Sequence, residues 1–227
     1  MRDWTGLMSR SAMRLMWVWL VGLASVMAEE GWVSLFDGET LAGWTNGKGE
    51  AMAEGKWVAE GGLLHRKSLG AGSLFTEKEY GDFAMEFEWK ISKGGNSGVK
   101  YRLQQIEGKW LGLEYQVLDD ENFKGGEVKA EHEAAGLYDL KAPEGRDLKA
   151  VGEWNQARIE VKEGVVRHFL NGALVMELAI PGEEWEERFE KSKYRKAKGF
   201  GVNARGKIHL QDHGNQVWFR YLRIQEY

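Results

Sequence analysis

The sequence contains no cysteine and only two prolines among its 227 residues. The lack of cysteine excludes disulfide bonds, a thiolate nucleophile and membrane attachment through a lipid-modified cysteine. The scarcity of proline leaves no proline-rich linker, so we expect no boundary between folded domains. A Gly-x-Ser-x-Gly elbow and a phosphate-binding glycine loop are absent as well. These absences argue against a serine or cysteine hydrolase and against a nucleotide-binding protein.

The sequence has one long apolar run, from Leu15 to Met27, which follows Arg10 and Arg14. A basic segment, a short apolar segment and small residues before Ala28 are typical of a secretory signal peptide. We therefore expect residues 1–28 to be a cleaved signal peptide and residues 29–227 to form one exported domain, periplasmic or extracellular, with no membrane attachment after cleavage. The alternative is an N-terminal membrane anchor. Arg10 and Arg14 are not adjacent, so twin-arginine export is not indicated.

The charge balance is acidic. The whole chain has a formal net charge of −4, and removal of residues 1–28, with three arginines and one aspartate, lowers it to −6. Nucleic acid is therefore not the expected partner, because phosphate binding requires a basic patch.

Strict alternation of apolar and polar residues predicts β-strands. In residues 83–90, Phe83, Met85, Phe87 and Trp89 alternate with Ala84, Glu86, Glu88 and Lys90, and residues 97–104 and 112–118 repeat the pattern. Glu163-Gly164 and Asn171-Gly172 predict hairpin turns, the second of type I′. The charged segment 181–199 predicts a short helix or a helical loop. Residues 119–148 are polar and irregular except for "AAGLYDL", and they predict a long surface loop. Together these features predict an all-β fold, an antiparallel β-sandwich of jelly-roll type with one short helical insertion.

The polar positions of these strands form a candidate functional face. If the strands pair in sequence order, one sheet surface carries acids, bases and amides side by side, namely Glu86, Glu88, Lys90, Lys100, Arg102, Glu114 and Gln116. One interpretation is a solvated surface with cross-strand ion pairs. The other is a concave face that binds a saccharide.

The histidines and the C-terminal motif leave several alternatives open. We expect His65 and His168 to be structural. His209 and His213 share a face with Gln211 if the strand continues, and two such histidines can bind zinc, although no third ligand follows from spacing. Asp119 and Asp120 indicate either a turn or ligands for a hard cation. In "HLQDHGNQVWF" we expect the apolar residues to fill the core and Gln211, Asp212 and His213 to border a site.

Seven motifs, in order along the chain, resemble the 3-keto-disaccharide hydrolase family of exported bacterial proteins. They are "WVSLFDGETLAGW", "FEWKISKGGNSGVKYR", "GLEYQVLDD", "AAGLYDL.AP", "GEWNQARI", "HFLNG" and "LQDHGNQVWFRYLRI". The resemblance runs from Trp32 to Ile224 and implies a concanavalin A-like jelly roll. It also implies cleavage of glycosides whose sugar carries a ketone at C3, formed by a separate sugar 3-dehydrogenase.

The resemblance implies a set of roles. A ketone at C3 acidifies the C2 proton, so a base can remove that proton and the C1 substituent can leave by elimination, after which water adds. Glu114 or His213 would be the base, and Arg102 and Lys90 would stabilise the enediolate. Sugar hydroxyls and rings would contact Asn96, Gln116, Tyr138, Gln211, Asp212 and Trp218. In an alternative, a divalent metal would bind the enediolate in place of Arg102, and Asp119, His132 and His213 would be its ligands.

Two other functions fit the same sequence. A non-catalytic carbohydrate-binding module would use the same fold, and it would require amides and aromatic rings but no base. A retaining glycosidase would require two carboxylates about 5 Å apart, which Glu86 and Glu88 could supply from one strand face.

Overall fold

The computed structural model describes residues 31–67 and 70–227. The predicted signal peptide, residues 1–28, lies outside the described residues. The elements are β1 (Val33–Ser34), β2 (Trp44–Thr45), β3 (Trp57–Glu60), β4 (Leu63–Arg66), β5 (Leu74–Tyr80), β6 (Phe83–Ile91), β7 (Asn96–Ile106), β8 (Lys109–Leu118), a 3₁₀ turn (Ala130–His132), β9 (Asn155–Lys162), β10 (Val165–Leu170), β11 (Ala173–Ala179), α1 (Glu183–Lys191), β12 (Gly206–Leu210) and β13 (Val217–Glu226).

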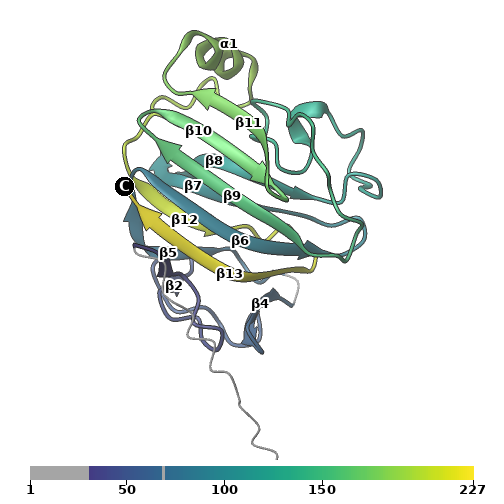
Figure 1. The fold of residues 1–227 in the computed structure, drawn as a ribbon. Coiled ribbons are helices and arrows are strands. Elements are labelled where there is room, and N and C mark those ends of the chain that lie inside the picture. Colours follow the sequence, from purple (N-terminus) through teal and green to yellow (C-terminus); the bar gives the residue numbers. More distant parts are fainter. Residues whose placement is uncertain (1–30, 68–69) are drawn as a thin grey trace, which may run out of the picture.

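The strands form two antiparallel sheets packed face to face (Figure 1). Sheet A has the order β11-β10-β9-β6-β13-β4-β3, with β1 also paired to β13, and sheet B has the order β2-β5-β12-β7-β8. Figure 1 looks onto sheet A, with β7, β8 and β12 behind it. The predicted antiparallel jelly-roll sandwich with one short helix is confirmed.

The sandwich interior is built from the alternating apolar positions. Phe83, Met85, Phe87 and Trp89 of β6 are each at most 2% exposed. Phe87 meets Tyr115 of the facing sheet edge to face, with ring centroids 5.6 Å apart, which is a favourable geometry for two aromatic rings. In the C-terminal motif Ile208, Leu210, Val217 and Phe219 are fully buried, so their predicted core positions are confirmed.

Both predicted hairpins are present. Glu163 and Gly164 connect β9 to β10 with φ values of 48° and 76°, and Asn171 and Gly172 connect β10 to β11 with 50° and 86°. Two consecutive positive φ angles define the type I′ turn, whose twist matches that of the flanking strands.

The structure corrects the expectation of a single polar face. Strand β6 pairs with β9 and β13, whereas β7 pairs with β8 and β12. The short segment from Ser92 to Gly95 crosses from one sheet to the other instead of forming a hairpin. Glu86, Glu88 and Lys90 therefore lie on the outer face of sheet A, on the opposite side of the sandwich from Glu114.

The segment between β8 and β9 has a buried central part, so its prediction as a surface loop is wrong there. Ala134, Ala135 and Leu137 are fully buried. The Ala135 N–H donates to the Gln116 carbonyl and the Tyr138 N–H to the Glu114 carbonyl, so this segment covers the edge of sheet B along β8. In the described part of the chain no helix is long and apolar enough to cross a membrane.

A buried ion pair fixes the loop that follows β12. Arg66 Nε of β4 lies 2.6 Å from Asp212 Oδ1, and the two side chains are 2% and 8% exposed. Asp212 also accepts hydrogen bonds from the Gly72 and Gly214 N–H groups. The pair thus connects the "LQDHG" loop to the neighbouring segments.

We expect Asp212→Asn to lower the free energy of unfolding by about 3–5 kcal/mol, because removing one partner leaves the buried Arg66 charge uncompensated. Urea denaturation measures the change. The exposed helical pair Glu187 and Lys191 provides the control, since Glu187→Gln should leave the stability unchanged. Equal effects of the two substitutions would contradict this role of Asp212.

Candidate active site

One row of side chains crosses the outer face of sheet B. Phe75 of β5 pairs with His209 of β12, His209 with Lys100 of β7, and Lys100 with Glu114 of β8. Tyr138 extends the row, because its backbone pairs with that of Glu114 at the sheet edge. Directly paired residues point to the same side of a sheet, so the row places an aromatic ring, an imidazole, an ammonium, a carboxyl and a phenol next to one another.

Glu114 is the carboxylic acid of this row, and its surroundings shift its pKa. It is only 3% exposed, and Lys100 Nζ lies 3.5 Å from its Oε2. Burial raises the pKa of Glu114 above its ordinary value of 4.5, and the positive charges of Lys100, Lys193 and His213 act in the opposite direction. A carboxylate held in this way combines weak hydration with a nearby cation, a combination that suits a general base.

Gly98 leaves the space that the Glu114 side chain occupies. A Cβ atom at position 98 would lie 2.2 Å from Glu114 Oε1 and 3.0 Å from its Cδ. A glycine in the interior of a strand such as β7 weakens that strand, and it often marks a position where another group approaches the backbone closely. The "NSGV" motif therefore positions the acid of the neighbouring strand.

A second row carries amides. Gln116 of β8 pairs with Gly98, and its Nε2 donates to Asn96 Oδ1 over 3.3 Å. The Gln211 N–H donates to the Gly98 carbonyl, and the Ser97 hydroxyl donates to the Gln211 carbonyl over 2.9 Å. Gln211 thus continues the sheet by one residue beyond β12, and the three amides border the acid.

Tyr138 is enclosed by two basic side chains. His132 stacks on its ring with a centroid distance of 4.6 Å, and Lys193 Nζ lies 4.1 Å from the ring centre. Asp139 holds both neighbours: its Oδ1 lies 2.9 Å from His132 Nε2, and its Oδ2 accepts from the Lys193 N–H over 2.7 Å. The segment after α1 therefore delivers a lysine to the Glu114 end of the row.

The other end of the row is aromatic. Phe75 contacts His209 at 4.6 Å and Trp110 at 5.3 Å between ring centroids. His209 is 6% exposed, and burial together with the Lys100 charge holds its pKa well below the ordinary 6.5. His209 is therefore neutral at physiological pH, and the half-buried Trp110, packed on the buried Phe75, offers apolar surface beside it.

The structure brings six of the predicted site residues to this face or its edge. Glu114, Asn96, Gln116 and Tyr138 lie together as described. Gln211 is at the border, and the exposed His213 acts electrostatically on Glu114.

Four predicted residues lie elsewhere. Arg102 has a φ of 47° at a β-bulge and turns its guanidinium to Asp82, 2.7 Å away. Asp212 binds Arg66. Lys90 and Trp218 lie on sheet A, where Lys90 Nζ is 4.8 Å from the centre of the Trp218 ring.

The three predicted metal ligands have separate partners or positions. The Asp119 carboxylate accepts from the Gly94 and Asn122 N–H groups, and His132 binds Asp139, while His213 is exposed. Within residues 31–67 and 70–227, no group of three or more histidine, aspartate and glutamate side chains is arranged to hold a metal ion.

Sequence reasoning missed Lys193, His209, Phe75 and Trp110 as members of one surface. Lys193 lies in a strongly charged segment that reads as a solvated helix, so only the fold shows that it reaches Glu114. His209 and Phe75 are cross-strand partners separated by more than one hundred residues. Gly98 carried a signal, a glycine inside an alternating strand.

The fold and this face define a jelly-roll β-sandwich with a buried acid and cationic partners on one sheet. The chain belongs to the 3-keto-alpha-glucoside-1,2-lyase-like domain family, which it matches over residues 31–225. This membership confirms the resemblance inferred from the motifs.

Individual relatives agree with this membership. The chain is 32% identical to a 3-keto-disaccharide hydrolase of Bacteroides thetaiotaomicron, over 86% of this chain and 78% of the relative. It is also similar to two crystal structures of candidate glycosyl hydrolases from Parabacteroides distasonis. One has a TM-score of 0.80 at 29% identity, covering 87% of this chain and 94% of the other. The second has a TM-score of 0.63 at 25% identity, covering 87% and 84%.

We expect Gly98→Ala to displace the Glu114 carboxyl and to destabilise the fold by about 1–3 kcal/mol, because the added methyl group overlaps with Oε1. Thermal unfolding measures the loss, and a crystal structure of the variant shows the displacement. Gly47→Ala is the matched control, since a Cβ there meets its nearest atom at an ordinary 3.4 Å. An unchanged Glu114 position in the Gly98 variant would contradict the assigned role of this glycine.

Proposed function

We propose that this protein cleaves glycosides that carry a ketone at C3 of the sugar, at the outer face of sheet B. The observation that carries the proposal is the buried Glu114 carboxyl with Lys100 beside it. Family membership and the similarity to a 3-keto-disaccharide hydrolase support a glycoside-cleaving enzyme. The family description, a 1,2-lyase acting on a 3-keto-alpha-glucoside, supports elimination between C1 and C2 as the reaction type.

Glu114 is the general base. The C3 ketone acidifies the proton on C2, and Glu114 takes that proton while the electron pair moves toward the carbonyl oxygen as an enediolate. Its raised pKa makes the carboxylate a stronger base than an exposed glutamate. Gly98 gives the carboxyl the room to hold this position.

Lys100 and Lys193 stabilise the negative charge that develops on the enediolate oxygen. Lys100 lies beside the carboxyl, and Lys193 lies over the Tyr138 ring and acts electrostatically on Glu114. Fixed cations at the position where charge appears lower the barrier most effectively when they are already in place before the reaction. In this proposal the two lysines take the roles that the family resemblance suggested for Arg102 and Lys90.

We assign the role of the acid to His213. When the C1–O bond breaks, the departing oxygen requires a proton, and His213 lies at the border of the site within electrostatic range of Glu114. Asn96, Gln116 and Gln211 hold sugar hydroxyls, and Trp110 supplies apolar surface for the sugar ring. Addition of water at C1 and return of a proton to C2 complete a net hydrolysis.

This chemistry places the protein after another enzyme. An ordinary glycoside has no ketone at C3, so a sugar 3-dehydrogenase must supply the substrate. We propose that the reaction takes place outside the cytoplasm, in keeping with the signal peptide predicted for residues 1–28.

The other two functions fit this structure less well. A binding module needs no buried acid next to two lysines, and such a cluster is costly to maintain without a use. A retaining glycosidase would use Glu86 and Glu88, but Glu86 binds Arg158 and Arg223 and Glu88 binds Arg220.

We expect Glu114→Gln to lower kcat for a 3-keto-glucoside about 10²–10⁴-fold, because the amide cannot accept the C2 proton. A chromogenic leaving group reports the rate, and calorimetry with the variant reports retained substrate binding. The unoxidised glucoside serves as the control substrate and should not react. Full activity of the variant, or equal turnover of the two substrates, would refute the assignment.

We expect Lys100→Met to shift the acidic limb of the kcat/KM–pH profile to higher pH. The base must be deprotonated, so activity rises as pH increases through the pKa of Glu114, and the Lys100 charge lowers that pKa. Removing the charge therefore raises the pKa of Glu114. Lys100→Arg keeps the positive charge, so it should leave the acidic limb in place. A limb that stays in place, or moves to lower pH, would show that Glu114 is not the titrating base.

A further inference from the structure

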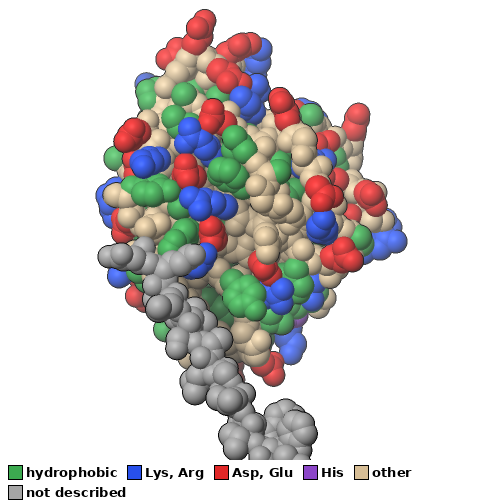
Figure 2. Space-filling model, viewed as in Figure 1, with side chains coloured by type: hydrophobic (Ala, Val, Ile, Leu, Met, Phe, Trp, Pro, Cys, Tyr) green, Lys and Arg blue, Asp and Glu red, His purple; other side chains and the backbone are tan. Residues whose placement is uncertain are grey.

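The outer face of sheet A contains a groove that the proposed reaction does not use. Its volume is about 1040 Å³, at the upper end of the roughly 300–1,000 Å³ typical of small-molecule sites. Its lining comes from strands β6, β9, β10 and β13, together with Trp32 and Ser34 at β1. Figure 2 shows the same face, where charged side chains of both signs lie among apolar ones.

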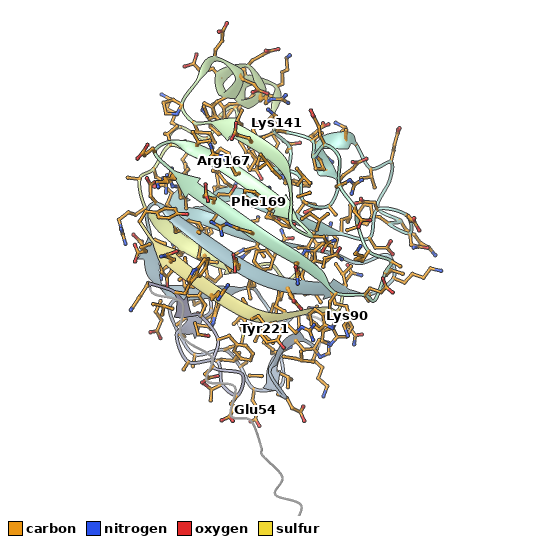
Figure 3. The ribbon with its side chains drawn as sticks, in the orientation of Figure 1. Glu54, Lys90, Lys141, Arg167, Phe169 and Tyr221 are labelled. Carbon is orange, nitrogen blue, oxygen red and sulfur yellow. The ribbon has the colours of Figure 1, made fainter. Side chains whose placement is uncertain are left out.

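Aromatic rings lie at both sides of this groove. Phe169 is on β10 and Tyr221 is on β13 (Figure 3). Three strand spacings separate β10 from β13 in the sheet order, which corresponds to roughly 14 Å. A single sugar ring cannot contact both residues, so the groove suits a chain of several units. Trp32 also lines the groove, with Arg158 and Arg223 at 6.0 Å and 4.6 Å from its ring centre.

The charges of the groove are balanced. Glu86 lies between Arg158 and Arg223, at 3.1 Å and 2.7 Å, and Glu88 pairs with Arg220 at 2.6 Å. Each arginine that borders the groove thus has a carboxylate partner. The lining offers many fixed hydrogen-bond donors and acceptors, and its net charge is small. Such a surface complements a neutral polyhydroxylated ligand better than an anionic one.

Tyr221 is held in an unusual conformation. It lies at a β-bulge of β13 between Arg220 and Arg223, its φ is 54°, and its side chain is 68% exposed. A bulky residue rarely adopts a positive φ, and such outliers often occur where a side chain must be aimed at a ligand. The bulge projects this ring outward beside the groove.

We propose that the groove on sheet A is a second carbohydrate-binding site, which holds a neutral oligosaccharide of several hexose units. Phe169 and Tyr221 stack against separate sugar rings, and the arginine–glutamate network binds their hydroxyls. The two sheets place this site and Glu114 on opposite faces of the sandwich, so the two sites can be occupied at once. The inference does not depend on the chemistry proposed for Glu114.

The test is calorimetric titration of the full chain with maltohexaose and cellohexaose, both unoxidised. We expect saturable binding of at least one hexaose, and Kd at least tenfold higher in the double variant Phe169→Thr, Tyr221→Asn. Threonine suits a strand and asparagine tolerates a positive φ, so both substitutions preserve the backbone. Tyr227→Asn, which removes an exposed aromatic outside the groove, and Glu114→Gln should leave Kd unchanged.

Four results would overturn the inference. The first is that neither hexaose binds at millimolar concentration, and the second is that binding is lost in Glu114→Gln but kept in the double variant. The third is tighter binding of hexagalacturonate than of the neutral hexaoses. The fourth is self-association of the chain that the double variant abolishes. Retained activity on a 3-keto-glucoside in the double variant separates this result from any failure of the site around Glu114.

Discussion

The burial of one carboxyl group beside a lysine organises the candidate active site. Glu114 lies in the row of side chains that crosses the outer face of sheet B. It fits there only because position 98 on the neighbouring strand is a glycine. Burial favours the protonated acid, while Lys100 and the cations beyond it favour the carboxylate. The surrounding features follow from this balance: the amides satisfy the polar border, Tyr138 covers the sheet edge, and Asp139 fixes the lysine that approaches from the helical segment.

Much of the fold follows from local patterns in the sequence. Alternation in residues 83–90 predicts a strand with one dry face, and Asn171-Gly172 predicts a type I′ turn, because both depend on neighbouring residues alone. The partition of strands between sheets does not follow in the same way. The segment Ser92–Gly95 has the composition of a hairpin turn, but it crosses the sandwich, and only the packing of β6 against β9 and β13 decides this.

The candidate site could be predicted only in part, because the sequence does not show how the strands divide between the two sheets. Glu114, Gln116 and Asn96 lie on strands that pair directly, so a local reading of "EYQVL" and "NSGV" brings them together. Lys90 was expected among them and lies on the other sheet, whereas Lys193 was not expected and arrives through tertiary packing of a distant segment. Arg102 and Asp212 each have an opposite charge nearby that sequence spacing cannot reveal, Asp82 and Arg66. The sandwich thus separates two polar faces that look like one in the sequence.

In the proposed reaction, cleavage begins with removal of the C2 proton by Glu114. The most direct measurement uses a 3-keto-glucoside labelled with deuterium at C2, with leaving-group release and label retention followed at early times. We expect slower release than from the unlabelled compound and loss of deuterium from the sugar product. Equal rates together with full retention of deuterium at C2 would contradict it, because the C1–O bond would then break without proton abstraction.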